Sequence, residues 1–405
     1  MDNILQNTFA QLGVDNAPGQ EITKKDDCHN LRGFPIEGRR VDFSHGDVNA
    51  FPPLPGSLEV FSRGFHEGSS QAYTEYRGRA DIRCQLADDL TKFLGTPVDG
   101  NQELILTGGT QSALFLAIGS LLPYGGKLAM ITPDYFANRK LAAFFGADIV
   151  SIPLYYMESE HRAGIDLNQL ENAFKKGVDV FLFSNPNNPT GAVYSAEEIR
   201  AIGTLACRWH VPVIVDELYS RQIFDSEPFT HLCAELERPE MVVTIIGPSK
   251  TESLSGFRLG AAFAPTEIIE RMEKLQAIVS LRAAGYCQSV FRTWFHEPAG
   301  FIEQRIHEHR RIRDMLVQQF RSVSGVQVRK TNAGSYLFPT LPKLDVTITE
   351  FVQILRILGD IIVTPGTEFG PEWTQSIRLN FSQDPDAAVQ GVKRLLKIME
   401  RYRKE

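Results

Sequence analysis

Lys250 stands in a loop where a lysine could act as a nucleophile. It follows the small-residue segment Gly247–Ser249, which comes directly after the apolar run Met241–Ile246. Arg258, at the centre of the glycine-flanked segment Gly256–Gly260, comes soon afterwards. A lysine in such a loop is usually just exposed. Near a bound phosphate and another cation, however, its pKa falls and the amine becomes nucleophilic.

A carboxylate closes another apolar run. Asp216 follows Val211–Val215, and Tyr219 stands three positions later. A carboxylate at the end of a buried strand is costly unless it meets a cation or a hydrogen-bond donor. The alternative is a helix N-cap, which explains an aspartate at this position in isolation.

Two further loops carry residues that could bind a ligand. Gly108–Gln111 follows Glu103–Thr107, and Ser184–Gly191 follows Val178–Phe183. Small residues at the start of a helix let backbone N–H groups approach a phosphate, although either loop alone could be an ordinary turn. Gly108–Gln111 is not GxGxxG, and the chain contains no Walker sequence. A dinucleotide or ATP site therefore has little support.

An arginine lies inside a late apolar segment. Arg378 interrupts Ser376–Phe381, which otherwise has the composition of a strand. An arginine that points into a protein normally needs an anion, and its planar guanidinium suits a carboxylate. The segment therefore indicates a binding site for a carboxylate.

Apolar runs alternate with helical patterns from about residue 100 onwards. The runs are Glu103–Thr107, Lys127–Thr132, Asp148–Pro153, Val178–Phe183, Val211–Val215, Met241–Ile246 and Arg258–Ala264, and the helical patterns include Gln111–Leu122, Ala196–Trp209 and Ile268–Leu281. Several runs are hydrophobic at consecutive positions, which is typical of strands covered on both faces. We therefore predict an α/β fold with a mostly parallel sheet, and ligands beyond the carboxyl ends of its strands.

The pattern changes near residue 295. A charged helical segment, Phe301–Phe320, is followed by possible strands at Val326–Lys330 and Ser335–Phe338 and by a closing helix, Asp384–Arg403. This order indicates a smaller α+β unit. We predict a large domain over residues 51–294 and a small domain formed by residues 1–50 and 295–405. The pattern alone does not place the first 50 residues.

Length and composition set broad limits. A chain of 405 residues exceeds the usual size of one hydrophobic core, and its net charge of −7 argues weakly against nucleic acid as a partner. The start lacks a secretory signal, and no apolar stretch is long enough to span a bilayer. The five cysteines form no CxxC pair; they are Cys28, Cys84, Cys207, Cys233 and Cys287. We expect a cytoplasmic protein without a metal cluster or a disulfide framework.

Together and in this order, the motifs resemble those of fold-type-I pyridoxal-phosphate (PLP) enzymes of the class I/II aminotransferase family. The resemblance runs from about residue 40 to the C-terminus and depends on Asn187–Gly191, Asp216, Tyr219, Ser249-Lys250 and Gly256–Gly260. It implies the cofactor pyridoxal 5′-phosphate. It also implies an aspartate-aminotransferase-like fold, with a large PLP-binding domain and a smaller α+β domain.

The resemblance implies roles around the cofactor ring. Lys250 would form a Schiff base with the cofactor and then move the proton between Cα and C4′. Asp216 would pair with the pyridinium nitrogen, which makes the ring an electron sink. Asn188 and Tyr219 would hydrogen-bond the ring O3′, and Tyr135 would stack on the ring face.

Further roles concern the phosphate and the neighbouring subunit. The backbone of Gly109 and Thr110, with Ser249 and Arg258, would hold the phosphate. Tyr73 resembles the tyrosine that reaches the phosphate of the neighbouring subunit. The resemblance therefore implies a homodimer with shared active sites.

The substrate site is implied by the same resemblance. Arg378 would clamp the α-carboxylate, Asn188 would lie beside the substrate, and Gly46 matches a glycine loop that closes over it. Asn332–Phe338 and Val363–Gly370 resemble small-domain segments that face the site.

Four positions depart from the family pattern or stay open. Gly247 stands where many relatives carry a phosphate-binding serine, and Thr110 or a water could replace that donor. The loop around Gly46 lacks the usual compact Gly-x-Pro. His45, in this loop, could contact the substrate or be a hydrogen-bonded loop residue. Arg282 could read a substrate carboxylate, bind phosphate or pair with a surface acid.

The expected function is an aminotransferase that acts on an amino acid and a 2-oxo acid by a ping-pong mechanism. The motifs indicate PLP more firmly than they indicate the reaction, so a lyase, a cyclising synthase or an oxidase stays an alternative. A PLP-binding regulator is a more distant alternative, because the residues before the resemblance show no helix-turn-helix pattern. The amino donor, the acceptor and the pathway stay open.

Overall fold

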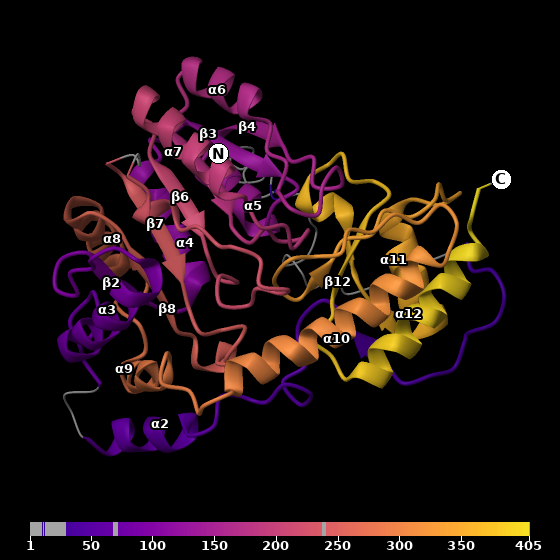
Figure 1. The fold of residues 1–405 in the computed structure, drawn as a ribbon, viewed down its shortest axis with the longest axis horizontal. Coiled ribbons are helices and arrows are strands. Elements are labelled where there is room, and N and C mark those ends of the chain that lie inside the picture. The colour runs from indigo at the N-terminus through magenta and orange to yellow at the C-terminus, as the bar shows by residue number, and fades with distance from the viewer. Residues whose placement is uncertain (1–9, 11, 13–29, 68–71, 237–239, 405) are drawn as a thin grey trace.

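A seven-stranded sheet forms the centre of the larger part of the molecule (Figure 1). The structure, a computed structural model, describes residues 10, 12, 30–67, 72–236 and 240–404. In sheet order the strands are β2 (Leu104–Thr107), β8 (Gly260–Phe263), β7 (Val242–Ile246), β6 (Val213–Asp216), β5 (Val180–Ser184), β3 (Lys127–Thr132) and β4 (Asp148–Pro153). All neighbours are parallel except β8, which runs antiparallel to β2 and β7. The predicted α/β fold with a mostly parallel sheet is confirmed.

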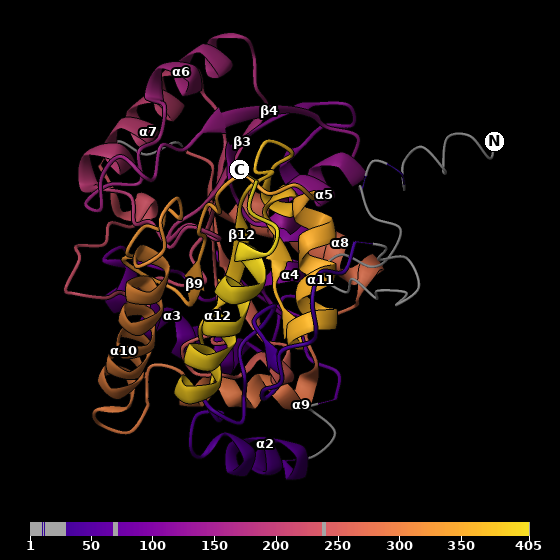
Figure 2. The same cartoon turned by 90° about the vertical axis from the view of Figure 1, so that its right-hand side faces the viewer.

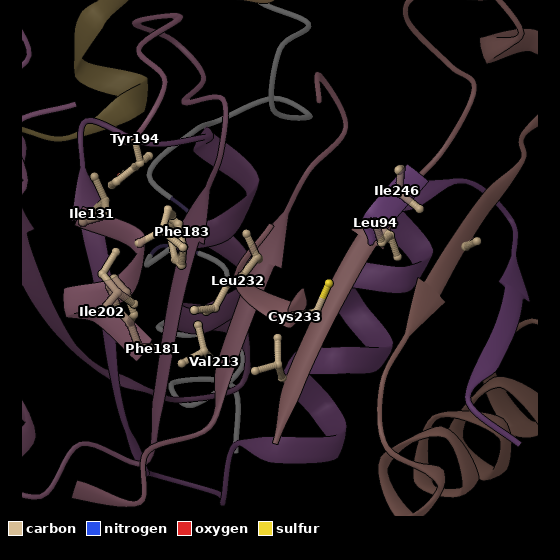
Figure 3. Close-up of a cluster of buried hydrophobic side chains, with 14 of the residues drawn as sticks. Leu94, Ile131, Phe181, Phe183, Tyr194, Ile202, Val213, Leu232, Cys233 and Ile246 are labelled. Carbon is tan, nitrogen blue, oxygen red and sulfur yellow. The ribbon is translucent and has the colours of Figure 1, made fainter. Parts of the chain in front are cut away.

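Alternate residues of the central strands belong to two different cores. In β5, Phe181 and Phe183 pack into one core, whereas Val180 and Leu182 pack into the other. All four side chains are fully buried. This double burial explains why the strand is hydrophobic at consecutive positions. Figure 3 shows the first core, where Phe181 and Phe183 lie beside Ile202.

Helices cover both faces of the sheet. One face is covered by α3 (Ala80–Leu94), α6 (Leu167–Lys175) and α7 (Ala196–Trp209), and the other by α4 (Thr110–Leu121), α5 (Phe136–Phe144) and α8 (Thr266–Val279). Beyond the sheet, α2 (Ser57–His66) packs on α9 (Gly285–Gln288) and on the 3₁₀ turn η5 (Ser289–Thr293). Two further 3₁₀ turns are η3 (Leu232–Ala234) and η4 (Ser255–Phe257).

The start of α7 shows how local sequence sets an element. The hydroxyl of Ser195 accepts the backbone N–H of Glu198, and the Glu198 carboxylate accepts the N–H of Ser195, a reciprocal capping box. The same carboxylate also accepts the N–H groups of Ala163, Gly164 and Ile165. One buried glutamate therefore begins the helix and fixes the loop that precedes α6.

A separate core organises the rest of the described chain. Its helices are α10 (Phe301–Arg321), α11 (Ile348–Gly359) and α12 (Pro385–Glu400), which lie side by side in Figure 2. They pack on a three-stranded antiparallel sheet of β11 (Thr364–Pro365), β12 (Ile377–Asn380) and β9 (Tyr336–Leu337). The 3₁₀ turn η6 (Gly366–Phe369) lies between β11 and β12 in the chain. A small parallel pair joins β1 (Val41–Asp42) to β10 (Ile361–Ile362). This pair brings residues from before position 50 into the second part.

The prediction of a strand at Val326–Lys330 is wrong. Within this segment Gln327 alone forms an isolated bridge, with Thr340. The buried guanidinium of Arg329 instead donates to the carbonyl oxygens of Tyr156 and Ser159. The segment is thus held by side-chain contacts to the larger part of the molecule, and not by pairing with a neighbouring strand.

Three observations bear on the broad class of protein. No helix among the described residues is long and apolar enough to cross a membrane. In the same residues, no group of three histidine, cysteine or acidic side chains is arranged to hold a metal ion. Cys28 lies outside the described residues, and no disulfide joins the other four cysteines.

Candidate active site

The loops that follow β5, β6 and β7 meet at the carboxyl edge of the sheet and line a cavity of about 300 Å³. Residues of the second part complete its wall. Nine predicted site residues line this cavity: Thr110, Tyr135, Asn188, Asp216, Tyr219, Ser249, Lys250, Arg258 and Arg378. The sheet edge therefore gathers residues that lie far apart in the sequence, as expected for an open parallel sheet.

Asp216 ends β6 and faces the cavity. Its Oδ1 accepts the backbone N–H of Leu218 at 3.1 Å. Burial raises the pKa of Asp216 to about 6, although the Leu218 N–H and the charge of Lys250 lower it. The chain continues into a turn rather than a helix, so the N-cap interpretation is wrong. A cationic ring nitrogen at this carboxylate would stabilise its charged form.

A cradle for an anion lies at the start of α4. A Cβ atom on Gly109 would collide with the guanidinium of Arg258, and a Cβ on Gly260 would collide with the backbone nitrogen of Thr110. The φ of Gly109 is +90°, a conformation that other residues rarely adopt. Glycine at both positions lets Arg258 approach the helix N-terminus, a combination suited to phosphate.

Gly247 makes room for Thr110 in this cradle. A Cβ on Gly247 would lie 2.9 Å from the methyl carbon of Thr110. Thr110 and Ser249 both line the cavity. Glycine at position 247 therefore leaves room for Thr110, which lines the cavity at the start of α4.

Asp134 ties together the loops that carry Tyr135 and Asn188. Its carboxylate accepts the N–H of Tyr135 at 2.6 Å and the N–H of Ser184 at 3.0 Å. The Ser184 hydroxyl in turn accepts the N–H of Asn188 at 3.2 Å. Burial raises the pKa of Asp134 to about 7. Tyr135 is fixed further by a hydrogen bond of 3.2 Å from its hydroxyl to Gln111 Oε1.

Arg378 projects from β12 into the cavity and is only 4% exposed. Its Nη1 donates to Asn188 Oδ1 at 3.2 Å, and its Nη2 donates to the carbonyl oxygen of Ser44 at 3.0 Å. The guanidinium carbon lies 4.3 Å from the ring centre of Tyr336 and 4.8 Å from that of Phe369. Its buried Nε has no hydrogen-bond partner in the described chain. An arginine whose two Nη atoms are held by hydrogen bonds, and whose Nε–H has no partner among the described residues, is suited to bind a carboxylate.

Tyr336 is a site residue that the sequence patterns did not single out, although it lies in Asn332–Phe338, a segment expected to face the site. It accepts a hydrogen bond of 2.8 Å from the hydroxyl of Tyr219. Burial raises the pKa of Tyr336, but the charges of Lys250 and Arg378, together with hydrogen bonds to Tyr219 and Asn380, lower it below its ordinary value. Burial raises the pKa of Tyr219 well above its ordinary value. Tyr336 stands between Ser335 and the apolar residues Leu337 and Phe338, and nothing in this short segment marks one side chain as the polar contact.

Three predicted residues are not part of the cavity wall: Gly109, Tyr73 and Gly46. Gly109 lies behind it, beside the guanidinium of Arg258. Tyr73 is 82% exposed, and its ring lies 5.4 Å from the guanidinium carbon of Arg282. Gly46 lines a neighbouring groove, whereas Ser44 and His45 of the same loop line the cavity itself. The structure thus brings Tyr73 to Arg282 and not to Lys250 of its own chain.

The groups in the cavity fit a phosphorylated pyridine cofactor. Arg258 and the start of α4 supply donors for a phosphate, and Asp216 supplies a carboxylate for a ring nitrogen. Lys250 supplies an amine in the same space. Tyr135 offers an aromatic face. The cavity therefore offers a partner for the phosphate, the ring nitrogen, the aldehyde and the ring face of PLP.

Comparisons with known proteins agree on one family. The sequence profile described as "Aminotransferase class I and II" matches residues 48–395. A solved aspartate aminotransferase from Rhodobacter sphaeroides is 54% identical, with a TM-score of 0.93 over 99% of this chain and 100% of its own. The curated aspartate aminotransferase of Pyrococcus horikoshii is 26% identical over 84% of this chain and 86% of its own length. That of Sulfolobus acidocaldarius is 25% identical over 98% and 97%.

Proposed function

The chain belongs to the class I and II aminotransferase family, and from this we propose that it transfers the amino group of aspartate to a 2-oxo acid. Enzymes of this family depend on PLP and work by a ping-pong mechanism. The observation that carries the proposal is one cavity that holds Lys250, Asp216 and Arg378 together. Aspartate is proposed as the donor because the relatives named above are aspartate aminotransferases.

In this proposal, residues from several loops hold the cofactor. Lys250 binds it covalently, and Asp216 keeps its ring nitrogen protonated. Asn188 donates a hydrogen bond to the ring oxygen. The single hydroxyl proton of Tyr219 turns from Tyr336 to the same oxygen, and Tyr336 then donates to Tyr219. Tyr135 packs on the ring face. Ser249, Arg258, Thr110 and the backbone of Gly109 hold the phosphate. When bound, the cofactor withdraws electrons from the substrate carbon that carries the amino group.

Arg378 and Lys250 act on the substrate itself. Arg378 binds the α-carboxylate, and its contacts with Asn188 and Ser44 fix the direction of its guanidinium. Lys250 takes the proton from the substrate Cα and returns a proton during the same half-reaction. Gly46 lies on the loop that borders the substrate. A substrate held in one orientation exposes one bond to reaction, which favours amino transfer over side reactions.

We also propose a homodimer in which Tyr73 completes the partner's phosphate site. Tyr73 is exposed and lies away from the cavity of its own chain. Other large apolar side chains are also exposed on α2, before α3 and around the end of α8: Leu58, Phe65, Tyr76, Ile278, Val279 and Leu281. These elements lie at one end of the molecule in Figure 1. An exposed apolar area of this kind is typical of a subunit interface.

The domain division and the location of the protein are further proposals. We place the large domain at residues 51–294 and the small domain at residues 1–50 and 295–405, a division supported by the separate core around α10, α11 and α12. We propose a cytoplasmic enzyme whose partners are small molecules.

A single-turnover experiment tests the proposed reaction. The PLP enzyme is mixed with aspartate without oxygen, and the cofactor spectrum and the products are measured. We expect one equivalent of the 2-oxo acid and conversion of the cofactor to pyridoxamine phosphate. A second 2-oxo acid should then restore the original spectrum without added PLP. An amine, ammonia or a cyclised product, or a need for oxygen, would contradict the proposal.

A further inference from the structure

Four cationic side chains line the described cavity, and the proposed function uses three of them. Lys250 holds the cofactor, Arg258 holds the phosphate and Arg378 holds the α-carboxylate. The fourth is His45, on the loop that follows β1. Its side chain is 72% exposed, so its position is not explained by core packing.

The contacts of Arg378 place His45 at the substrate end of the cavity. Arg378 Nη2 donates to the carbonyl oxygen of Ser44, the residue directly before His45. Gln383 Nε2 donates to the carbonyl oxygen of His45 at 2.6 Å. The loop is therefore fixed on both sides of this position. His45 is therefore the residue next to Ser44, whose carbonyl oxygen binds Arg378, the proposed α-carboxylate clamp.

Asp42 keeps His45 protonated and oriented. His45 Nε2 lies 3.5 Å from Asp42 Oδ2, and its Nδ1 lies 3.1 Å from the carbonyl oxygen of Gly46. Ser44 fixes Asp42 through its N–H at 2.9 Å and its hydroxyl at 2.5 Å. The hydrogen bond to Asp42 raises the pKa of His45 to about 9, so the ring is cationic at neutral pH. The long separation from Asp42 leaves the Nε2 proton able to shift to another acceptor.

One of the two acidic residues that line the cavity is already paired. Glu368 lines the cavity, and its Oε2 lies 2.7 Å from Lys140 Nζ. Both side chains are mostly buried. Because Lys140 compensates this charge, Glu368 does not exclude a second substrate carboxylate.

We propose that His45 is a specificity-determining residue that binds the distal carboxylate of a dicarboxylic substrate. The inference rests on the proposed function, because it requires Arg378 to hold the α-carboxylate of the same molecule. Asp42 and His45 together carry no net charge. His45 therefore discriminates through a directed hydrogen bond rather than through long-range attraction.

The decisive test compares aspartate with asparagine, which has nearly the same shape without the distal charge. In His45→Gln, kcat/KM for aspartate should fall about 10- to 100-fold, the size of one charge-assisted hydrogen bond. The value for asparagine should change by less than about threefold, within the effect of an exposed substitution. His161→Gln, at an exposed histidine outside the cavity, is the matched control.

Arg282→Gln tests the competing residue. If this variant loses selectivity for aspartate while His45→Gln keeps it, His45 does not bind the distal carboxylate and the inference is wrong. An equal loss for aspartate and asparagine in His45→Gln would also overturn it. If the wild-type enzyme transaminates other amino acids but not dicarboxylic ones, the proposal of aspartate fails as well. A wild-type enzyme without any transamination would instead refute the proposed function.

A binding measurement gives an independent result. Succinate carries two carboxylates that stay ionised above pH 6.5, and propanoate carries one. Affinity of the PLP enzyme for succinate, relative to propanoate, should fall as the pH rises through about 9. In Asp42→Asn this fall should move to lower pH, since the partner that raises the pKa of His45 is lost. The charged groups around His45 stay in place: Lys250, Arg378, Arg39, Arg40, Asp47 and Asp384. An unchanged midpoint in Asp42→Asn would contradict the assignment.

Discussion

The hydroxyl of Tyr219 donates a hydrogen bond of 2.8 Å to the hydroxyl of Tyr336, a residue 117 positions later in the chain. The ring of Tyr336 also lies under the guanidinium of Arg378. One side chain of the second part thus contacts a proposed cofactor ligand and the proposed substrate clamp. A shift of β9 would therefore disturb both.

Tyr336→Phe should separate these two contacts. The variant keeps the ring under Arg378 and removes the hydroxyl that is the hydrogen-bond partner of Tyr219. One such hydrogen bond contributes about 0.5–1.5 kcal/mol. We expect kcat/KM to fall about 3- to 10-fold, and the free energy of unfolding to fall by no more than the same amount, about 0.5–1.5 kcal/mol. Tyr336→Ala should also raise KM because the ring is lost. Tyr124→Phe, at an almost fully exposed tyrosine, is the control. Wild-type kinetics in Tyr336→Phe would show that this hydroxyl has no role in the site.

Lys250 should carry the cofactor. Reduction of the PLP enzyme with borohydride, followed by peptide mass mapping, should place a pyridoxyl group on the peptide that contains Lys250. Lys250→Ala should bind PLP without this adduct. An adduct on Lys140 or on any other lysine would move the site elsewhere.

Asp216→Asn should retain PLP and lose most of the catalysis. Asparagine is nearly isosteric, but it has no charge to hold a proton on the ring nitrogen. Loss of one charged interaction at a reacting centre commonly costs about 2–4 kcal/mol, or roughly 10²–10³ in rate. Single-turnover rates with aspartate measure the effect. Turnover at the wild-type rate would show that the carboxylate only accepts the Leu218 N–H.

Tyr73 should act across the subunit interface. A mixture of Tyr73→Phe chains with Lys250→Ala chains should form heterodimers. If Tyr73 acts in trans, one site of each heterodimer carries both substitutions and the other site carries neither. Activity should rise above that of either variant alone. Light scattering gives the oligomeric state, and subunit exchange must be verified separately. If exchange occurs without any gain in activity, the site is not shared.

Asp134 should make the stability of the cofactor-free protein depend on pH. Its pKa is about 7 in the folded chain and 3.8 as an ordinary carboxyl group. Between about pH 4 and 7 the folded chain holds a proton that the unfolded chain has released. This contribution to stability is therefore lost as the pH rises through that window.

Asp134→Asn removes this titration. Denaturant unfolding at pH 5 and pH 7 should show a smaller loss of stability with rising pH in the variant, by at most about 1.4 kcal/mol per pH unit. Asp88→Asn, at an exposed position of α3, should keep the wild-type slope. Equal slopes in all three proteins would show that Asp134 is already ionised at pH 5.

The strands of the large sheet could be predicted from sequence because burial on both faces leaves a strong pattern. Lys127–Thr132 and Asp148–Pro153 have the predicted bounds in the structure. The closing helix begins at Pro385, with Asp384 as its N-cap. The residues at the strand ends could then be grouped because parallel strands bring their carboxyl ends to one edge.

Contacts between distant segments could not be predicted in the same way. Val326–Lys330 alternates like a strand, but Arg329 anchors it to carbonyl oxygens some 170 residues away. Nothing in the short segment around Tyr336 marks its side chain as a polar contact in the cavity. The paired state of His45 depends on the fold of its loop around Asp42. In each case one side chain makes a contact that local sequence does not encode.

The pairing of β1 with β10 has a consequence for synthesis on the ribosome. Val41 pairs with Ile361, so β1 cannot form its pair until a strand about 320 residues later has been synthesised. At about 5–20 residues per second, translation takes about 15–60 seconds to cover that interval. During this time the seven strands of the large sheet and the Lys250 loop have already emerged. The nascent enzyme therefore acquires its cofactor-binding edge before the strand that carries Arg378 exists.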